Sequence, residues 1–296
     1  RTPTERGQGT ERTQPMENSS WPLWQGQVAQ AQRWIRRGKL DKVVLARAAV
    51  VPLEGFAARV RALSAVASAP QPLFAYAVGD AQSSLIGASP ERLVAKTGSR
   101  VESEAVAGTA AASEGAALQH SAKDAREHAW VVAHLRAVLS QHCRSLEHAP
   151  SPSIWPLPGL LHLRTPFVGE LSRPQHILTL VQALHPTPAV AGHPVAAALD
   201  AIETLETETR DIYAGPVGGF DAAGDGEFAV ALRAAHFRAN AAHLWAGAGL
   251  VRASDAAQEY AETALKLQAI AAQLALPQDA LDPPTGQAPL CTSLSA

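Results

Sequence analysis

Apolar residues dominate positions 40–50, which read LDKVVLARAAV and include two cations. The run is typical of a β-strand. Side chains alternate between the two faces of a strand, so Lys42 shares a face with Val44 and Ala46, and Arg47 lies on the other face. The simplest interpretation is that both cations lie at strand ends and extend past the apolar surface to water.

The first half of the chain also carries patterns that are typical of a helix and of further strands. Residues 21–40 place apolar side chains at helical spacing, with Gly38 as a stop signal. Residues 72–110 predict successive strands that are separated by Gly-Asp, Gly and Thr-Gly turn signals.

The second half opens with a predicted helix over residues 121–146, in which Ser121 and Asp124 form a capping box. Residues 215–251 predict an antiparallel meander of three strands that turns at AAGDG and at RANAA. Three more helices are predicted at residues 176–186, 193–213 and 254–276.

The order of these elements indicates the fold class. Strands occur in groups and do not alternate one for one with helices, which favours an α+β fold with antiparallel sheet. Residues 21–276 are expected to form one large domain. Residues 1–20 are polar and turn-rich and are expected to be disordered, and residues 277–296 are expected to form a flexible C-terminal tail.

Composition narrows the class of protein. With 47% hydrophobic and 18% charged residues, the 296-residue chain can bury a sizeable core. The net charge of −2 without a basic stripe argues against nucleic acid as a partner. No apolar run approaches the roughly 20 residues of a membrane span. The two cysteines, Cys143 and Cys291, show no metal or disulfide spacing, and the N-terminus lacks the apolar core of a secretory signal, so a cytoplasmic setting is expected.

Acidic residues occupy positions where a helix pattern calls for apolar ones. Asp124 and Glu127 precede Val131 and Leu135 at helical spacing, so they continue the apolar stripe of their helix. A structural alternative is that both lie in the first turn, where the helix dipole favours anions.

Glu259, Glu262 and Lys266 likewise share one face of the final helix. An ordinary surface pair between Glu262 and Lys266, worth a few tenths of a kcal/mol, is the structural alternative. The functional interpretation is that the two helices meet and offer carboxylates to one hard cation. Magnesium suits this arrangement, because it takes oxygen ligands and keeps places for water and substrate.

Glu91 follows a tight bend in the stretch GASPERL, before the strand pattern resumes. A carboxyl group and a lysine that lie close together can act as a pair, one as general acid and the other as general base. Burial and neighbouring charges set the pKa of each. The small-residue stretches AVAGTA and WAGAGLV allow backbone amides to approach an anionic ligand. Neither stretch matches a nucleotide-binding fingerprint.

Several motifs in a fixed order give the chain a family resemblance. They run from Lys42 to Leu267 and read KVVLAR, GASPERL, AVAGT, KDAREH, HLRTPF, ALHPTPAVAG, YAGPVGGFD, VALRAA, AGAGLV and EYAETALKL. Together they resemble the chorismate-binding enzymes, which include isochorismate synthase, salicylate synthase and the large subunits of anthranilate and aminodeoxychorismate synthases. The resemblance implies an antiparallel β-sheet sandwich flanked by helices. It also implies a chain truncated at its N-terminus, because relatives usually carry a further segment before the KVVLAR strand.

The resemblance assigns roles to matching residues. Lys42 looks like the general base that activates water for attack at C2 of the chorismate ring, and Glu91 looks like the general acid that protonates the leaving C4 hydroxyl. Glu127 and Glu262 match magnesium ligands, with Asp124 and Glu259 behind them. The residues implied in substrate binding are Gly108, Thr109 and Lys266 for the ring carboxylate, Tyr213, Arg233, Gly247 and Gly249 for the enolpyruvyl carboxylate, and His162 in the pocket lining.

Members of the family differ in their nucleophile. Ala107 stands where bacterial-type aminodeoxychorismate synthases carry a lysine, and Lys42 is present where anthranilate synthases lack one, so water is favoured as the nucleophile. The segment HPTPAVAG resembles the isochorismate synthase version. We therefore expect a monomeric isochorismate synthase that uses chorismate and magnesium, in menaquinone or siderophore biosynthesis. The alternatives are a salicylate synthase and an inactive truncated member.

Overall fold

The computed structural model describes residues 20–281, apart from residues 54, 70–72, 112, 114 and 158–159. The predicted disordered N-terminus and flexible tail lie outside the described residues, except for Ser20 and residues 277–281. Leu281 is buried in the same hydrophobic cluster as Leu276. The packed part of the chain therefore reaches at least as far as Leu281.

Three of the described helices begin at a residue whose side chain caps free backbone N–H groups. Ser121 caps the longest described helix by accepting a hydrogen bond of 3.2 Å from the backbone N–H of Asp124. Asp255 caps the last one through the N–H groups of Ala257 and Gln258. The described helices are α1 (Trp21–Arg36), α2 (Ala57–Ala67), α3 (Gly115–His120), α4 (Ala122–His142), α5 (Ile177–Leu184), α6 (Val195–Leu205) and α7 (Ala256–Gln273).

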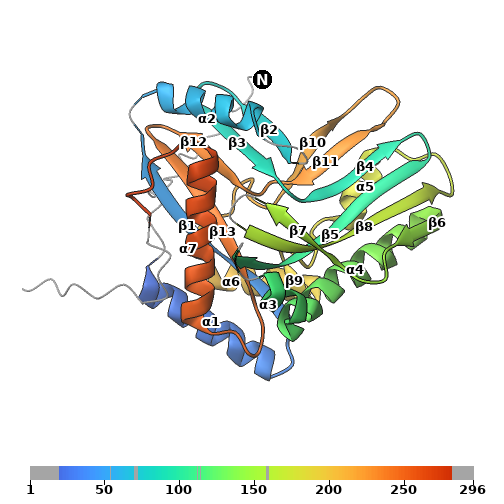
Figure 1. Cartoon of the computed structure of the whole chain (residues 1–296), viewed down its shortest axis with the longest axis horizontal. Coiled ribbons are helices and arrows are strands. Elements are labelled where there is room, and N and C mark those ends of the chain that lie inside the picture. Colours follow the sequence, from blue (N-terminus) through green and yellow to red (C-terminus); the bar gives the residue numbers. More distant parts are fainter. Residues whose placement is uncertain are drawn as a thin grey trace, which may run out of the picture.

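The strands form two antiparallel sheets (Figure 1). The order in the first sheet is β2 (Phe74–Gly79), β3 (Ser83–Ser89), β12 (Ala234–Arg238), β13 (Ala241–Leu250), β1 (Lys42–Pro52) and β9 (Gly192–His193). The order in the second is β10 (Pro216–Phe220), β11 (Gly226–Val230), β4 (Arg92–Thr97), β5 (Arg100–Ala111), β8 (Leu160–Leu171) and β6 (Cys143–His148), with β7 (Ser153–Leu157) also paired to β8.

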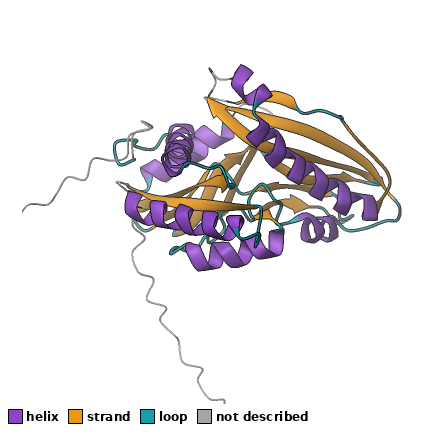
Figure 2. Cartoon of the chain, turned by 90° about the horizontal axis from the view of Figure 1, so that it is seen from below, coloured by secondary structure: helices purple, strands orange, loops and turns teal. Residues whose placement is uncertain are grey.

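Helices flank the two sheets (Figure 2). Leu267 and Ile270 of α7 pack into the hydrophobic cluster of the first sheet. Leu135 and Leu139 of α4 pack into that of the second sheet. Burying these apolar faces supplies the main stabilising free energy of such a fold. The predicted α+β class with antiparallel sheets and flanking helices is confirmed.

The predicted three-stranded meander over residues 215–251 is wrong. The segment holds four strands, of which β10 and β11 belong to the second sheet and β12 and β13 to the first. Both predicted turns exist, but between β11 and β12 the chain passes from one sheet to the other. No glycine or proline marks this passage, which spans residues 231–233, so the sequence pattern does not reveal it.

The chain also crosses between the sheets from β3 to β4, and the two crossings lie side by side. Glu91 lies in the first crossing and Arg233 in the second. The backbone N–H of Ala88 donates to the carbonyl of Arg233 at 3.2 Å, and that of Val230 donates to the carbonyl of Glu91 at 2.9 Å. Glu91 and Arg233, far apart in sequence, are thus held at one place between the sheets.

Strand β1 buries both of its cations. Lys42 is 2% exposed and Arg47 is 1% exposed, so the prediction that both reach water is wrong. Arg47 is not at a strand end either, because β1 continues to Pro52. The predicted alternation of faces is confirmed, since Lys42 lines a cavity together with Val44 while Arg47 contacts α7.

Arg47 links β1 to α7. Its Nε donates a hydrogen bond of 2.8 Å to Thr263 Oγ1, and its guanidinium carbon lies 3.4 Å from the ring centroid of Tyr260. A planar guanidinium stacks well on an aromatic face. The cation therefore belongs to the packing between sheet and helix.

The helix predicted over residues 193–213 ends early, because α6 stops before Glu206. The chain then runs along the edge of β1. Glu206 Oε1 accepts a hydrogen bond of 2.8 Å from the backbone N–H of Ala46, and Arg210 Nη2 donates one of 2.7 Å to the carbonyl of Val44. Strand β9 pairs with only the first two residues of β1. The side chains of Glu206 and Arg210 form hydrogen bonds with the backbone groups that follow, and they fix the part of β1 next to Lys42.

The sequence patterns did not predict α2 or the strands β6, β7 and β8. The helix predicted over residues 121–146 ends at His142, and the last four residues of that range belong to β6. Prolines explain why β7 and β8 were not predicted. Prolines surround the start of this region and Pro166 lies within β8, opposite Glu104 of β5. Because proline weakens a strand signal, the pattern reads as a loop. Pairing with β5, β6 and β7 overrides that local preference.

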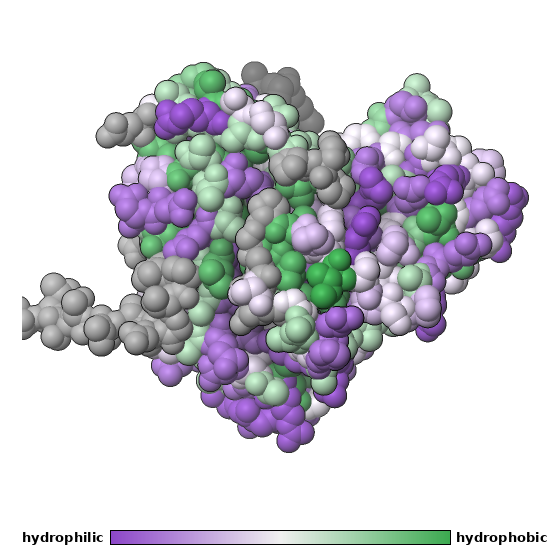
Figure 3. Space-filling model, in the orientation of Figure 1, coloured by the Kyte–Doolittle hydropathy of each residue, from purple (hydrophilic) through white to green (hydrophobic). Residues whose placement is uncertain are grey.

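On the face shown in Figure 3, hydrophobic residues gather near the middle, and hydrophilic residues cover much of the right-hand part. Single exposed apolar side chains are ordinary on a protein surface. Among the described helices, none combines the length and the hydropathy that a membrane crossing requires.

Candidate active site

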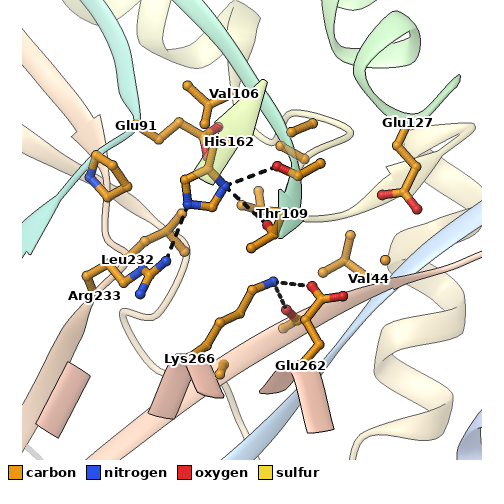
Figure 4. A pocket seen from close by; sticks show the side chains of 18 of the residues that line it. Val44, Glu91, Val106, Thr109, Glu127, His162, Leu232, Arg233, Glu262 and Lys266 are labelled. Atoms are coloured by element: carbon orange, nitrogen blue, oxygen red, sulfur yellow. Dashed lines mark hydrogen bonds and ion pairs between the residues drawn. The ribbon is translucent and has the colours of Figure 1, made fainter. Parts of the chain in front are cut away.

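A cavity of about 120 Å³ lies where the two sheets meet α4 and α7. Side chains from both sheets and from both helices point into it (Figure 4). Every residue predicted for the site lines the cavity except Glu259. The lining residues that were predicted are Lys42, Glu91, Gly108, Thr109, Asp124, Glu127, His162, Tyr213, Arg233, Gly247, Gly249, Glu262 and Lys266.

Lys42 and Glu127 form a buried ion pair in the cavity wall. Lys42 Nζ lies 3.2 Å from Glu127 Oε2, and the two side chains are 2% and 10% exposed. Strand β1 supplies the lysine and helix α4 the glutamate. Gly249 of β13 leaves room for the pair, because a Cβ at that position would lie 2.7 Å from both side chains. A packed strand and helix hold the amine in one place.

Glu262 and Lys266 form the pair expected from their spacing on α7. Lys266 Nζ donates to Glu262 Oε1 at 2.7 Å and to the carbonyl of Gly247 at 2.9 Å. The pair faces the cavity and not open solvent (Figure 4). Burial raises the pKa of Glu262, but Lys266, Lys123 and Lys42 together outweigh burial and hold that pKa below its usual value.

Glu259 lies behind the cavity and pairs with Lys123. Its side chain is 2% exposed, and its Oε1 accepts from Lys123 Nζ at 2.6 Å. Burial and the neighbouring Glu262 raise the pKa of Glu259. Sequence analysis missed Lys123, which lines the cavity. Its position four residues before Glu127, on the same helix face, was the available signal.

Oxygen donors for a cation come from α4 and α7. Asp124, Glu127 and Glu262 line the cavity, and Glu127 Oε1 is buried without a hydrogen-bond partner. An orphaned carboxylate oxygen fits a hard cation. Within the described part of the chain, no three acidic, histidine or cysteine side chains converge as a preformed metal cluster. The donor set therefore fits a metal that takes few protein ligands and keeps places for water and substrate, as magnesium does.

Glu91 is 4% exposed. Burial and the negative charge of Glu104 raise the pKa of Glu91 to about 8, against the opposing effects of Lys42 and of a hydrogen bond from Thr187. The carboxyl group is therefore protonated at neutral pH. A buried, protonated glutamic acid that borders a cavity is equipped to donate a proton. Neither Glu104 nor Thr187 was predicted from the sequence.

A neutral histidine and a buried arginine line another part of the cavity. Burial, Arg233 and Lys266 lower the pKa of His162 to about 3. Its Nδ1 lies 3.1 Å from the carbonyl of Gly108, and its Nε2 lies 3.4 Å from Arg233 Nη2. These contacts assign the proton to Nδ1, with Nε2 as the acceptor. Arg233 has a left-handed backbone (φ 52°), which is uncommon for a residue with a side chain.

Tyr213 completes this part of the wall. Burial raises its pKa to about 12, so its hydroxyl keeps its proton. Its ring stacks on that of Trp245, with centroids 6.2 Å apart. Together, the neutral phenol and the Arg233 guanidinium offer hydrogen-bond donors suited to an anionic ligand.

Gly108 lies where strand β5 is irregular. The pairing register between β5 and β8 shifts between Ala107 and Thr109, and Gly108 has φ 77°. A Cβ on Gly108 would lie 3.0 Å from Asp124 Cβ. Glycine is therefore required both by the backbone conformation and by the approach of α4. The bulge turns this stretch of backbone toward the cavity.

The family model of chorismate binding enzymes matches residues 2–275. This chain belongs to the chorismate-binding enzymes. The predicted resemblance is confirmed.

Two relatives of this chorismate-binding enzyme illustrate the similarity. The salicylate biosynthesis isochorismate synthase of Pseudomonas aeruginosa is 41% identical over 256 residues, which cover 83% of this chain and 53% of that protein. Isochorismate synthase MenF of Bacillus subtilis is 33% identical over 253 residues, which cover 83% and 54%. The chain thus spans about half the length of these relatives.

Solved structures of the family share the fold. The putative 2,3-dihydroxybenzoate-specific isochorismate synthase DhbC of Bacillus anthracis matches with a TM-score of 0.82 and 34% identity, covering 93% of this chain and 78% of that one. Anthranilate synthase component I of Streptococcus pneumoniae matches with a TM-score of 0.74 and 26% identity, covering 88% and 61%. Chorismate-binding enzymes with different products therefore share this scaffold.

Proposed function

We propose that this chorismate-binding enzyme is an isochorismate synthase, an isomerase. Water attacks C2 of the chorismate ring and the C4 hydroxyl leaves as water, so the reaction is reversible and involves no redox change. Relatives that carry the name isochorismate synthase, at 41% and 33% identity, support this choice.

The observation that carries the proposal is that Lys42 and Glu91 line one cavity from separate elements. Glu91, with a pKa raised to about 8 by burial and by Glu104, holds a proton for the leaving hydroxyl. Lys42 takes the proton from the attacking water. The proton donor and the proton acceptor are thus separate side chains that are each held in place, which is what general acid–base catalysis requires.

Two residues favour water over an amine as the nucleophile. By family resemblance, Lys42 is the water-activating lysine that anthranilate synthases lack. Ala107 occupies the position of the lysine in bacterial-type aminodeoxychorismate synthases, and it lines the cavity here.

Magnesium is the cofactor proposed. Glu127 and Glu262 would hold it from two helices, with Asp124 and Glu259 behind them, and the orphaned Glu127 Oε1 supports this assignment. When bound, the cation would neutralise the ring carboxylate of chorismate. Three lysines pair with the acidic side chains: Lys42 faces Glu127, Lys123 faces Glu259 and Lys266 faces Glu262.

The other lining residues are assigned to substrate binding. Backbone groups of Gly108 and Thr109, with Lys266, would hold the ring carboxylate. Donors from Tyr213 and Arg233, with the backbone of Gly247 and Gly249, would hold the enolpyruvyl carboxylate, next to His162. We further propose that residues 21–276 form a catalytic domain that works as a cytoplasmic monomer in menaquinone or siderophore biosynthesis, as the family resemblance implies.

The test is to incubate the purified chain with chorismate and magnesium and to identify the products by chromatography. Isochorismate without salicylate is the expected result. Salicylate with pyruvate would assign the chain to the salicylate synthases. A folded chain that forms no product would overturn the proposal and favour an inactive truncated member.

A further inference from the structure

Glu104 is a buried acid that stands behind Glu91 and does not line the cavity. Its side chain is 6% exposed on β5. Its Oε1 accepts a hydrogen bond of 3.1 Å from the backbone N–H of Arg92, the residue that follows Glu91. Its Oε2 accepts one of 2.5 Å from Arg164 Nε on β8. Both carboxylate oxygens are therefore used, one of them to anchor the crossing that carries Glu91.

The backbone around Glu91 is held on its other sides as well. The N–H of Glu91 donates to Ser89 Oγ at 3.1 Å, and its carbonyl accepts from the N–H of Val230 at 2.9 Å. With the Glu104 contact added, three successive parts of the bend have fixed partners. A bend held in this way keeps the carboxyl group of Glu91 aimed.

We propose that Glu104 is a positioning residue for Glu91, fixing its bend and placing a negative charge beside it that keeps the acid in its proton-donating form. This inference rests on the proposed role of Glu91 as general acid. The role of Glu104 is both geometric, through the Arg92 N–H, and electrostatic, through its charge.

The groups that act on Glu91 come from several elements. Lys42 of β1 and the hydroxyl of Thr187, in the loop after α5, favour the ionised form of Glu91. Burial and Glu104 favour the protonated form and prevail, since the pKa of Glu91 is raised to about 8. The positive charge of Arg164 offsets part of the negative charge of Glu104. Arg164 is itself 30% exposed and lies over the ring of Trp155. Water screens an exposed cation more than a buried anion, so the influence of Glu104 is not cancelled.

Two substitutions separate charge from position. Glu104→Gln keeps an oxygen that accepts from the Arg92 N–H but removes the negative charge. Arg164→Gln removes the counter-charge and leaves Glu104 in place. A matched control is Glu102→Gln, which removes a charge two residues away on the same strand face, where the side chain is 36% exposed and pairs with Arg92 and Arg100.

The first measurement is a carbon-13 NMR titration of the glutamate carboxyl groups in the full chain. The Glu91 signal is assigned by its loss in Glu91→Gln. We expect the Glu91 midpoint to move by about 1 pH unit to lower pH in Glu104→Gln, to higher pH in Arg164→Gln, and to stay in place in Glu102→Gln. An unmoved midpoint in folded Glu104→Gln would overturn the proposal. If that variant does not fold, an unmoved midpoint in Arg164→Gln would do so.

The second measurement is the pH profile of isochorismate formation. In Glu104→Gln we expect kcat at pH 8 to fall about 5-fold with little change in KM, and to return toward the wild-type value at pH 6. A loss of the same size at every pH would contradict the electrostatic role. The titration needs no turnover, so a wild-type chain that makes no isochorismate would defeat the proposed function without affecting the test of Glu104.

Discussion

At the scale of single residues, the site depends on ionisable side chains that are buried. Lys42 and Glu91 are both nearly inaccessible to solvent, yet both border the same cavity. Their surroundings differ: Lys42 faces the carboxylate of Glu127, whereas Glu91 has the like charge of Glu104 nearby. The like charge favours the protonated form of Glu91, which is the form that its proposed role as an acid requires.

Lys42→Ala is expected to lower kcat by about 10²- to 10⁴-fold, because it removes the group that we propose as the acceptor of the water proton. Chorismate binding should remain measurable by calorimetry, since other residues are assigned to its carboxylates. Lys39→Ala, at an exposed lysine three residues earlier, is the control and should retain wild-type turnover. Wild-type turnover in Lys42→Ala would show that Lys42 is not the base.

Glu91 also makes stability depend on pH. Its pKa rises from an ordinary 4.5 to about 8 on folding, so between these values the folded chain holds a proton that the unfolded chain has released. Its contribution to stability is therefore lost as pH rises from 4.5 to 8. Glu91→Gln should stabilise the chain relative to wild type by on the order of 3 kcal/mol at pH 9, and by little at pH 5.

The measurement for Glu91→Gln is urea denaturation at the two pH values. Glu147→Gln, an exposed glutamate on β6, provides the comparison and should show no such pH-dependent gain. An equal effect of Glu91→Gln at pH 5 and pH 9 would contradict a raised pKa.

At the scale of elements, the contact between β1 and α7 explains why Arg47 is buried, although the sequence pattern predicts that it reaches the surface. Arg47 donates to Thr263 and stacks on Tyr260, so the strand and the helix are joined by a polar side chain within an apolar layer. Polar groups in such a layer specify how the elements pack, because any other arrangement would leave them without these partners.

Arg47→Ala is expected to lower the free energy of unfolding by about 3 kcal/mol, since it removes the packing of a buried side chain and the partner of Thr263. Thermal and urea denaturation measure the change. Arg61→Ala, at an exposed position of α2, should change stability by less than about 0.5 kcal/mol. Equal stabilities of the two variants would mean that the Arg47 contacts contribute little.

The meeting of α4 and α7 is the element-scale feature that bears on the metal. Glu262→Ala is expected to abolish magnesium-dependent turnover and to weaken magnesium binding at least 10-fold, because one of the two proposed carboxylate ligands is lost. Isothermal titration with magnesium chloride measures binding directly. Glu203→Ala on α6 is exposed and should bind magnesium as wild type does. Full activity of the wild-type chain in a chelator would rule out the metal site.

At the scale of the whole molecule, the two crossings bind the sheets to each other. The backbone hydrogen bonds of Ala88 and Val230 join the crossings, and Gln273 of α7 donates to the carbonyls of Ala88 and Arg233. We therefore expect the two sheets to unfold together. Far-UV circular dichroism and tryptophan fluorescence should give coincident denaturation curves, and two separate transitions would contradict this.

Sequence patterns predict much of this architecture, because helices and hairpins follow local periodicity. The division into two sheets is different, since it depends on long-range pairing that no local signal encodes. Lys42 and Glu91 stood out because a charged residue interrupts an apolar run and because the motifs match a family. Glu104 did not, since it alternates with Ser103 and Ala105 as an exposed strand residue would. Its burial depends on Arg164 and on the Arg92 N–H, which lie on other strands.

Strand β1 pairs with β13 along most of its length, and Val43 lies opposite Leu250. At about 5–20 residues per second, a ribosome needs roughly 10 to 40 s to synthesise the intervening chain. An apolar strand that has left the exit tunnel spends that interval without its partner, when pairing with other nascent chains leads to aggregation. Lys42 begins this strand and Arg47 divides it into two short apolar pieces, so we expect the two cations to limit such pairing before the protein has folded.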